Sequence, residues 1–218
     1  MGILSSFGVT GISSAKNTWQ HKPTVWLFVL SNEDGEMIGG VRLDIKSGFS
    51  MPLETALKKY PSVQNLARTY EIKYGVAELC GLWIERDYRR ANLASALIKA
   101  AIATAPNIGV NYILGFANEH SLKTTNQLGF QQVERVENSG VFFYPDDRYK
   151  SLLIELDAIN FRTSVSKDRE TICFLRKNLT YTEIASSPEE INMIHYHLIS
   201  ESIKIKKKSE ALKARLAA

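Results

Sequence analysis

Apolar and polar positions alternate in two runs near the start of the chain. TVWLFVLS (24–31) and GEMIGGVRLDIKSG (35–48) are rich in residues that favour strands, and the NEDG between them is typical of a turn. They predict an antiparallel hairpin. Two later runs, VAELCGLWI (76–84) and VNYILGFA (110–117), are apolar almost throughout. Such runs are typical of central strands that are covered on both faces.

Helical spacing of apolar residues follows the hairpin and the first central strand. MPLETALKKYPSVQNLARTYE (51–71) predicts a helix that Pro61 breaks, with a second short helix around 62–68. ERDYRRANLASALIKAAIATA (85–105) predicts a tight turn that runs into an amphipathic helix. These segments predict helices before and after the strand at 76–84 in the chain.

A further helix and two strands are predicted after the second central strand. NEHSLKTTNQL (118–128) reads as a helix that ends at Gly129, and FQQVERVE (130–137) and YKSLLIELD (149–157) read as strands. The order strand, helix, strand, helix over 76–129 is a βαβα unit. Its two strands should therefore be parallel neighbours joined by a right-handed crossover.

The pattern changes beyond Asp157. SPEE (187–190) has the form of a helix start, with a serine cap, proline at the first helical position and a reciprocal glutamate. Apolar residues then recur at helical spacing, which predicts a long helix over about 188–216. We therefore expect an α/β domain over 1–157 and a mainly helical C-terminal extension over 158–218.

Composition places the chain among ordinary globular proteins. It has 218 residues, 44% of them hydrophobic and 23% charged. Cys80 and Cys173 have no CxxC or Cys/His spacing, which predicts neither a disulfide framework nor a metal site. No apolar run approaches the length of a membrane span, and the first residues lack the features of a signal peptide. A cytoplasmic location is expected.

The net charge of +4 lies in the last eighteen residues. Residues 201–218 contain six lysines and arginines and two glutamates, and the difference of four equals the whole net charge. The remaining 200 residues are balanced. A nucleic-acid-binding body would spread basic residues over a face, so no nucleic-acid partner is expected.

Two segments carry a resemblance to a known family. LWIERDYRRANLASALI (82–98) and GFANEHSLKTTNQLGF (115–130) resemble the signature of the GCN5-related N-acetyltransferase (GNAT) superfamily, in which an apolar strand leads into a loop that opens a helix, and a later strand ends in Asn before a helix that closes in L-G-F. The resemblance implies a mixed, mostly antiparallel sheet with a central parallel strand pair and flanking helices. It also implies transfer of an acyl group, most simply acetyl, from coenzyme A to an amine.

A helix N-terminus supplies unpaired N–H groups and partial positive charge, both of which bind phosphate. By the resemblance, the diphosphate of acetyl-CoA or another acyl-CoA would be held there. The loop residues predicted to bind it are Arg89, Arg90, Ala91, Asn92, Leu93, Ala94 and Ser95. Asparagine and alanine replace glycines of the family pattern at 92 and 94, and asparagine tolerates a left-handed conformation.

The resemblance also implies a site for the pantetheine arm. The strand before the loop diverges from its parallel neighbour in such folds, so its main chain can bind the arm as an added strand would. The residues predicted there are Leu82, Trp83 and Ile84, and by similarity Asn118 and Ser121 contact the same arm.

Attack of an amine on a thioester needs a group that accepts a proton. Glu78 is the one carboxylate in the apolar strand, and it is a candidate base because burial raises a carboxyl pKa. A structural ion pair with Arg42 is the alternative for Glu78. Where the family has a tyrosine that protonates the leaving thiolate, this chain has Thr125, a very poor acid. Either no acid is used, or a residue elsewhere supplies the proton; the candidates are His120, Tyr112 and Tyr144.

A second resemblance is to the acyl-homoserine lactone and long-chain N-acyl amino acid synthases of the same superfamily. It is carried by GGVRLDIKSGFSMPLE (39–54) followed by AELCGLWIERDYR (77–89). It implies acyl carrier protein as an alternative donor. A non-catalytic member that senses coenzyme A is a third reading. The acceptor would be a small-molecule or peptide amine, no metal is expected, and the C-terminal helix could form a homodimer or cover the acceptor groove.

Overall fold

A seven-stranded sheet forms the centre of the computed structural model, which describes residues 19, 22–89, 92–186 and 191–198. The strand order is β1-β2-β3-β4-β7-β5, with β6 also paired to β7. Only β3 and β4 are parallel. The strands are β1 (Val25–Ser31), β2 (Met37–Ile45), β3 (Val76–Ile84), β4 (Tyr112–Ala117), β5 (Gln131–Gln132), β6 (Val141–Phe143) and β7 (Lys150–Asp157). This arrangement confirms the predicted fold class.

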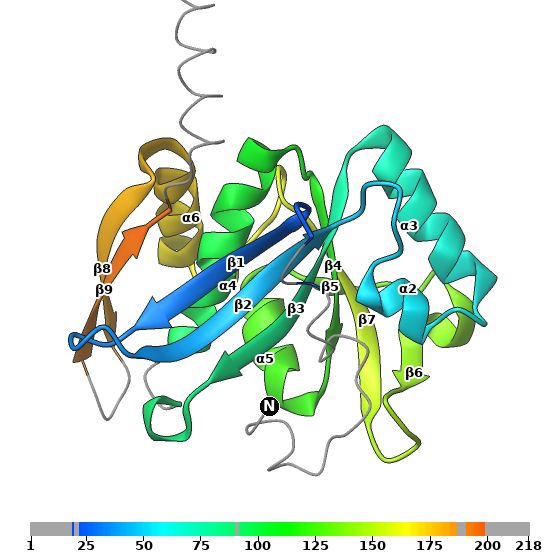
Figure 1. Ribbon diagram of the computed structural model, residues 1–218, viewed down its shortest axis with the longest axis horizontal. Coiled ribbons are helices and arrows are strands. Elements are labelled where there is room, and N and C mark those ends of the chain that lie inside the picture. Colours follow the sequence, from blue (N-terminus) through cyan, green and yellow to red (C-terminus); the bar gives the residue numbers. More distant parts are fainter. Residues whose placement is uncertain (1–18, 20–21, 90–91, 187–190, 199–218) are drawn as a thin grey trace, which may run out of the picture.

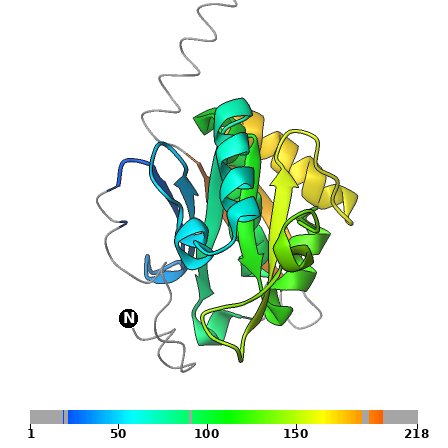
Figure 2. The same cartoon turned by 90° about the vertical axis from the view of Figure 1, so that its right-hand side faces the viewer.

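Helices cover both faces of the sheet (Figure 1). One face carries α2 (Pro52–Ala56) and α3 (Pro61–Lys73), which follow β2 in the chain. The other face carries α4 (Leu93–Thr104), α5 (Glu119–Gln127) and α6 (Ser166–Asn178). Each face has its own hydrophobic cluster. Figure 2 shows α2 and α3 on one side of the sheet and α6 on the other.

The first elements follow the predicted pattern closely, with different lengths in two places. β3 has the predicted bounds, and the hairpin β1–β2 pairs as expected. α3 begins at Pro61, in a first turn where the missing N–H costs nothing, and runs to Lys73, beyond the short helix predicted at 62–68. The predicted strand at 130–137 is shorter, since only Gln131 and Gln132 pair with β7.

The long C-terminal helix predicted from about residue 188 is wrong for 191–197. These residues form strand β9 (Ile191–His197), which pairs antiparallel with β8 (Thr180–Ser186). Ile194 and Tyr196 are buried, whereas Met193 and His195 are exposed, so the burial repeats every two residues as in a strand. The predicted capping residues 187–190 and the rest of that helix, 199–216, lie outside the described residues.

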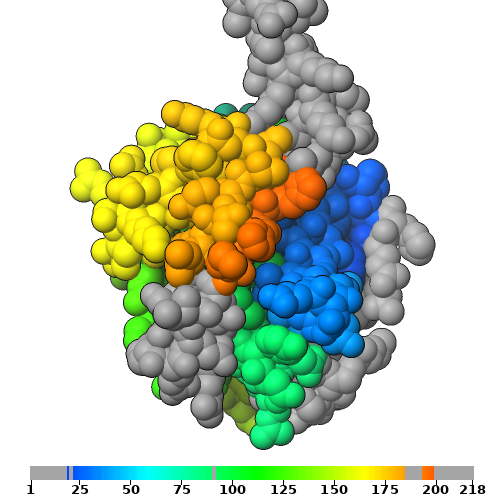
Figure 3. Space-filling model, turned by 90° about the vertical axis from the view of Figure 1, so that its left-hand side faces the viewer, coloured from blue at the N-terminus to red at the C-terminus, as the bar shows by residue number. Residues whose placement is uncertain are grey.

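The C-terminal extension belongs to the same core as the rest of the chain. Ile172 and Leu175 of α6, and Ile194 and Tyr196 of β9, are buried in the hydrophobic cluster that surrounds α4. Figure 3 shows α6, β8 and β9, coloured gold to orange, beside the blue β1–β2 hairpin. The described part of the extension therefore covers α4 and leaves the opposite face of the sheet to α2 and α3. No helix within the described ranges is long and apolar enough to cross a membrane.

Candidate active site

The parallel strands β3 and β4 separate half-way along their length. Their pairing runs from Val76 with Tyr112 to Leu79 with Gly115 and then stops. β3 nevertheless continues to Ile84 and β4 to Ala117. The strands therefore diverge beyond Leu79, as the family resemblance implied. We call the point where the pairing ends the apex.

A bulge in β3 follows the apex. Arg42 of β2 pairs with Cys80, but Gly40 pairs with Trp83, so β3 has one extra residue between the two pairs. Gly81, at φ +65°, supplies the left-handed conformation that the bulge requires. A Cβ at Gly40 would lie 3.0 Å from Trp83 Nε1, so these two residues share a face. The bulge therefore places the indole of Trp83 on the α2/α3 face.

The bulge also decides which main-chain groups face the gap between the strands. The N–H of Glu85 donates to the carbonyl of Ile38 in β2 (2.7 Å). In an antiparallel ladder the next residue points the opposite way, so the main chain of Ile84 faces away from β2, on the side of the divergence. The side chain of Arg89 reaches back to this point, and its Nε donates to the carbonyl of Ile84 (3.2 Å). Leu82, Trp83 and Ile84 were predicted to bind a pantetheine arm. The bond from Glu85 to Ile38 fixes the orientation of the main chain at Ile84.

Free amide hydrogens lie where α4 begins. Asn92 precedes the helix in a left-handed conformation at φ 57°, and its side chain makes no capping bond. The N–H of Ser95 donates to the carbonyl of Asn92 (3.1 Å). Among the described residues, the N–H groups of Leu93 and Ala94 have no acceptor. This turn thus keeps two donors and the positive end of the helix dipole available to an anion.

Two of the residues predicted in this loop, Arg90 and Ala91, lie outside the described residues. A short 3-10 helix, Arg86–Tyr88, lies between β3 and the turn. Arg86 and Arg89 are exposed and add positive charge beside the start of α4.

The predicted residues after β4 form the start of α5. Asn118 caps the helix, and its Oδ1 accepts the N–H groups of His120 and Ser121 (both 3.1 Å). The N–H of Asn118 donates in turn to Ser121 Oγ (3.1 Å). His120 is exposed. Thr125 is 4% exposed, and its hydroxyl donates to helix carbonyls, including that of Ser121 (3.1 Å). The cap is thus rigid, while the Thr125 hydroxyl is engaged within the helix.

The two tyrosines considered as alternative acids lie near opposite ends of β4, Tyr112 within the strand and Tyr144 in the loop between β6 and β7. Tyr112 begins the strand, and its hydroxyl donates to Asp157 (3.4 Å), away from the divergence. Tyr144 stacks on Phe116, with ring centroids 5.7 Å apart. Phe116 is the first residue of β4 beyond the pairing with β3. Tyr144 is therefore the candidate that lies beside the diverging strands.

Glu78 lies one residue before the apex, on the α2/α3 face. Its strand partners are Asp44 in β2 and Leu114 in β4, and Leu114 belongs to the cluster under α2 and α3. Glu78 is 4% exposed, and its Oε2 accepts the N–H of Leu53 in α2 (2.7 Å). Burial raises the pKa of Glu78 to about 8, although the bond from Leu53 acts in the opposite direction. A carboxyl with this pKa can exchange a proton near neutral pH.

The alternative in which Arg42 and Glu78 form an ion pair is wrong for these two residues. Arg42 Nε instead donates to Cys80 Sγ (3.2 Å), and its guanidinium lies 4.9 Å from the centre of the Trp19 ring. Burial raises the pKa of the Cys80 thiol well above its ordinary value. Cys80 is therefore held as a neutral thiol and is a poor nucleophile.

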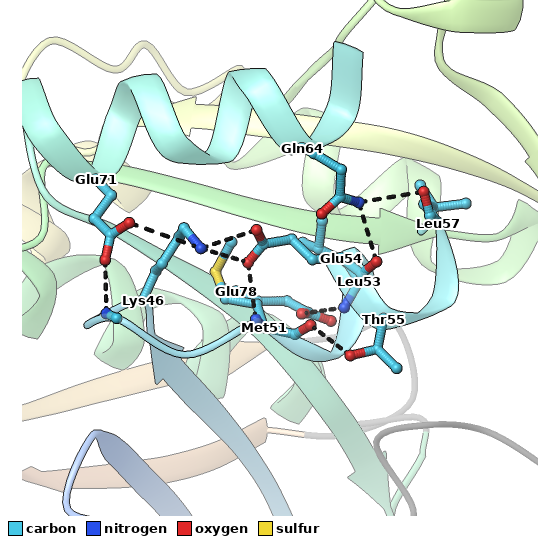
Figure 4. A network of polar contacts seen from close by, with 10 residues as sticks. Lys46, Met51, Leu53, Glu54, Thr55, Leu57, Gln64, Glu71 and Glu78 are labelled. Atoms are coloured by element: carbon cyan, nitrogen blue, oxygen red, sulfur yellow. Dashed lines mark hydrogen bonds and ion pairs between the residues drawn. The ribbon is translucent and has the colours of Figure 1, made fainter. Parts of the chain in front are cut away.

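Lys46 ties β2 to α2 and α3 close to Glu78 (Figure 4). Its Nζ donates to Glu54 Oε1 (2.9 Å) and lies 3.7 Å from Glu71 Oε2. Glu54 also accepts the N–H of Met51 (2.9 Å) at the start of α2. These bonds hold α2 in place, which in turn positions the N–H of Leu53 that Glu78 accepts.

Sequence reasoning missed Asp44, the strand partner of Glu78. Asp44 is 3% exposed, and burial raises its pKa. The signal was present, because Asp44 alternates with apolar residues in a strand whose other face is buried. Only the register of β2 against β3 places it beside Glu78. The described residues contain no group of three potential His, Cys, Asp or Glu metal ligands.

Comparisons with known sequences point to one family. The sequence model of the acetyltransferase (GNAT) family matches residues 9–130. An uncharacterized protein of Mycobacterium bovis is 29% identical over 85 residues, which are 38% of this chain and 31% of that protein. An uncharacterized protein of Mycobacterium tuberculosis strain H37Rv gives the same values. The chain thus spans about a third of the length of the curated relatives it matches.

Solved structures with a similar fold include FeeM, an N-acyl amino acid synthase from uncultured soil microbes. It has a TM-score of 0.57 and 16% identity, over 72% of this chain and 86% of that chain. The spermidine N-acetyltransferase from Vibrio cholerae, in complex with CoA and spermine, matches with a TM-score of 0.45 and 16% identity, over 66% of this chain and 73% of that chain. At such identity, the likeness to FeeM shows the fold.

Proposed function

Because the chain belongs to the acetyltransferase (GNAT) family, we propose that it transfers an acyl group, most simply acetyl, from coenzyme A to an amine. The observation that carries this proposal is the divergence of β3 and β4 beyond Leu79 and Gly115, together with the free N–H groups at the start of α4, the next α-helix after β3 in the chain. A proton-accepting carboxyl, Glu78, stands at the closed end of the same divergence.

Coenzyme A fits the residues that are present. The N–H groups of Leu93 and Ala94 would hold the diphosphate, since helix N-termini bind phosphate through free amides and the dipole. The main chain of Ile84 would bind the pantetheine arm in the manner of an added strand. Asn118 and Ser121, fixed by the cap of α5, would border the arm on the β4 side. When bound, coenzyme A supplies the acyl group as a reactive thioester.

Glu78 would act as the general base, directly or through water. Most amines are protonated at neutral pH, and a base is most effective when its pKa lies near the working pH. The raised pKa of Glu78 meets that condition. Thr125 has no part in this proposal, because its hydroxyl is bonded within α5. His120 and Tyr144 stay open as donors of a proton to the leaving thiolate.

The phosphate site is tested by Ser95→Glu. A glutamate in the first turn of α4 should leave stability unchanged or slightly raised, because it complements the helix dipole. The same charge should repel the diphosphate and weaken coenzyme A binding by roughly tenfold. Calorimetric titration with acetyl-CoA measures the affinity, and thermal unfolding measures the stability.

Ser166→Glu is the matched control, because Ser166 is an exposed residue in the first turn of α6. It should affect stability in the same direction and leave coenzyme A binding unchanged. Equal affinities for acetyl-CoA in the wild type and the Ser95→Glu variant would contradict the phosphate site.

Transfer of a longer chain from acyl carrier protein is the second candidate. The fold of FeeM, an N-acyl amino acid synthase, and the exposed Arg86 and Arg89 beside α4 favour it, because an acidic carrier would meet these arginines. Thermal-shift titrations with acetyl-CoA and with acyl carrier protein separate the two donors. Stabilisation by the acylated carrier alone would establish the second candidate.

A member of the family that only binds coenzyme A is tested by Glu78→Gln. An enzyme should retain acetyl-CoA binding and lose most of its turnover with an amine acceptor, whereas a sensor has no turnover to lose. Formation of free thiol from acetyl-CoA, measured across a panel of amines, reports the rate. An amine acceptor, a cytoplasmic location and a homodimer stay predictions.

A further inference from the structure

Asp44 and Glu78 are direct neighbours across strands β2 and β3. The N–H of Lys46 donates to the carbonyl of Val76, so the pair two residues further on, Asp44 and Glu78, is also of the hydrogen-bonded kind. The Cα atoms of such pairs lie about 5.5 Å apart, with both side chains on one face. Both carboxyl groups are more than nine-tenths buried.

One oxygen of this pair has no partner. Asp44 Oδ2 is buried and makes no hydrogen bond with any described residue. A bare carboxylate oxygen in a buried site is costly, and two buried carboxylates on paired residues of one sheet face cannot both stay ionised at low cost. A proton held between the two groups relieves both costs, since it supplies the missing partner and removes one charge.

We propose that Asp44 and Glu78 share one proton, and that Asp44 is a positioning residue which sets the pH at which Glu78 accepts a proton from the acceptor amine. The first part stands on geometry alone. The second part rests on the proposed acyl transfer. In that step the amine nitrogen bonds to the acyl carbon, the carbon–sulfur bond breaks with its electron pair left on sulfur, and the amine proton passes to Glu78.

Other charged groups surround the pair, and they do not remove the need for the proton. Those facing it are Lys22 before β1, Arg42 on β2, Lys46 directly after β2, Cys80 on β3, Glu54 on α2 and Glu71 on α3. Lys46 bonds to Glu54, and Arg42 to Cys80. Lys46 and Arg42 are therefore engaged elsewhere. The charge of Lys22 lowers the pKa of Asp44, but burial outweighs it and the pKa is raised. Asp44 and Glu78 remain partners across the ladder.

Carboxyl NMR titration of the ligand-free protein tests the shared proton. In Asp44→Asn the pKa of Glu78 should fall by about one unit or more, because a neighbouring negative charge is removed. In Glu78→Gln the pKa of Asp44 should fall by a similar amount, because coupling between two sites is reciprocal. The second variant keeps the test open if Asp44→Asn fails to fold, since the glutamine can still accept the N–H of Leu53.

Glu71→Gln is the matched control. It removes a carboxylate from the same network, where Glu71 accepts the N–H of Gly48 (2.8 Å) and lies near Lys46, but it does not touch the pair. It should shift the pKa of Glu78 by much less than Asp44→Asn does. Shifts below about 0.3 unit in both pair variants, or an equal shift in the control, would overturn the shared proton.

The pH profile of acyl transfer tests the role of Asp44. The rising limb of kcat/KM, which reports the ionisation of the base in the free enzyme, should move to lower pH in Asp44→Asn by the shift seen in NMR. A limb that stays in place overturns the positioning role. The titrations of Asp44 and Glu78 could be coupled while the protein transfers no acyl group to any amine. That result would support the shared proton, but it would overturn the role of the pair in catalysis and the proposed function.

Discussion

Single side chains at the site take their chemistry from burial. Glu78 would be an ordinary acid in water, but the sheet and α2 remove it from solvent and raise its pKa to about 8. Burial likewise raises the pKa of the Cys80 thiol and keeps it protonated. Asn92 acts through its backbone instead. Its left-handed conformation shapes the turn before α4, and its side chain makes no capping bond.

The raised pKa of Glu78 makes stability depend on pH. Between pH 4.5 and about 8 the folded chain binds a proton that the unfolded chain has lost, so the free energy of unfolding should fall as the pH rises through this window. The loss is on the order of 5 kcal/mol when complete. Glu78→Gln should remove this slope. Urea unfolding at several pH values measures it, and an equally steep dependence in the variant would contradict the raised pKa.

Asn92→Val tests the left-handed turn before α4. A β-branched residue at φ 57° costs roughly 1–2 kcal/mol, and the turn should reshape to relieve this strain and withdraw the free amides. We expect weaker coenzyme A binding, measured by calorimetry. Asn138→Val is the control, because Asn138 has φ 54° in a turn between β5 and β6. It should lose similar stability and keep its affinity for coenzyme A.

Among the secondary-structure elements, β3 carries most of the site. Its apolar run predicted a central strand with the observed bounds, because burial on both faces requires that pattern. The bulge could not be predicted, since the sequence around Gly81 does not show which residue of β2 it will face. The bulge nevertheless decides that Trp83 shares a face with Glu78 and that the main chain of Ile84 faces the divergence.

Gly81→Ala should therefore lower activity by more than its loss of stability would explain. Alanine at φ +65° costs about 1 kcal/mol, and relief of that strain would shift the bulge and misplace Ile84. We expect a fall in kcat/KM of at least tenfold in an acyl transfer assay. Gly48→Ala places the same strain at φ +75°, where a Cβ meets no atom within 4 Å. An equal loss of activity in that control would mean that the bulge has no special role.

In the molecule as a whole, the described part of the C-terminal extension belongs to the hydrophobic core around α4. Lys99 of α4 is 4% exposed and lies 2.6 Å from Glu183 of β8, and it also contacts Asp168 of α6 (3.2 Å). The hydroxyl of Tyr196 in β9 donates to the same Glu183 (2.7 Å). This network ties three elements of the extension to α4, the helix whose start is the proposed phosphate site.

Lys99→Met should destabilise the whole fold by roughly 3–5 kcal/mol, because it leaves Glu183 buried without its cation. Lys99→Met combined with Glu183→Gln should recover a large part of that loss. Chemical unfolding of both variants measures the difference. Asp146→Asn breaks the exposed pair with Arg148 (2.8 Å) and should cost far less than Lys99→Met, because water screens an exposed pair. If Lys99→Met lost as little stability as Asp146→Asn, the network would not hold the extension.

Local pattern was enough to predict the hairpin and the helix after Asn92, because each depends on residues close together in the chain. The parallel pair followed from the order strand, helix, strand, because such a connection favours parallel neighbours. The same reasoning failed at 191–197, where Ile191, Ile194 and Leu198 fit helical spacing while pairing with β8 made a strand. Amino-acid order thus determined the family, the central strands and the candidate base. Folding in three dimensions decided the bulge, the partner of Glu78 and the place of the extension, because these depend on contacts between residues far apart in the chain.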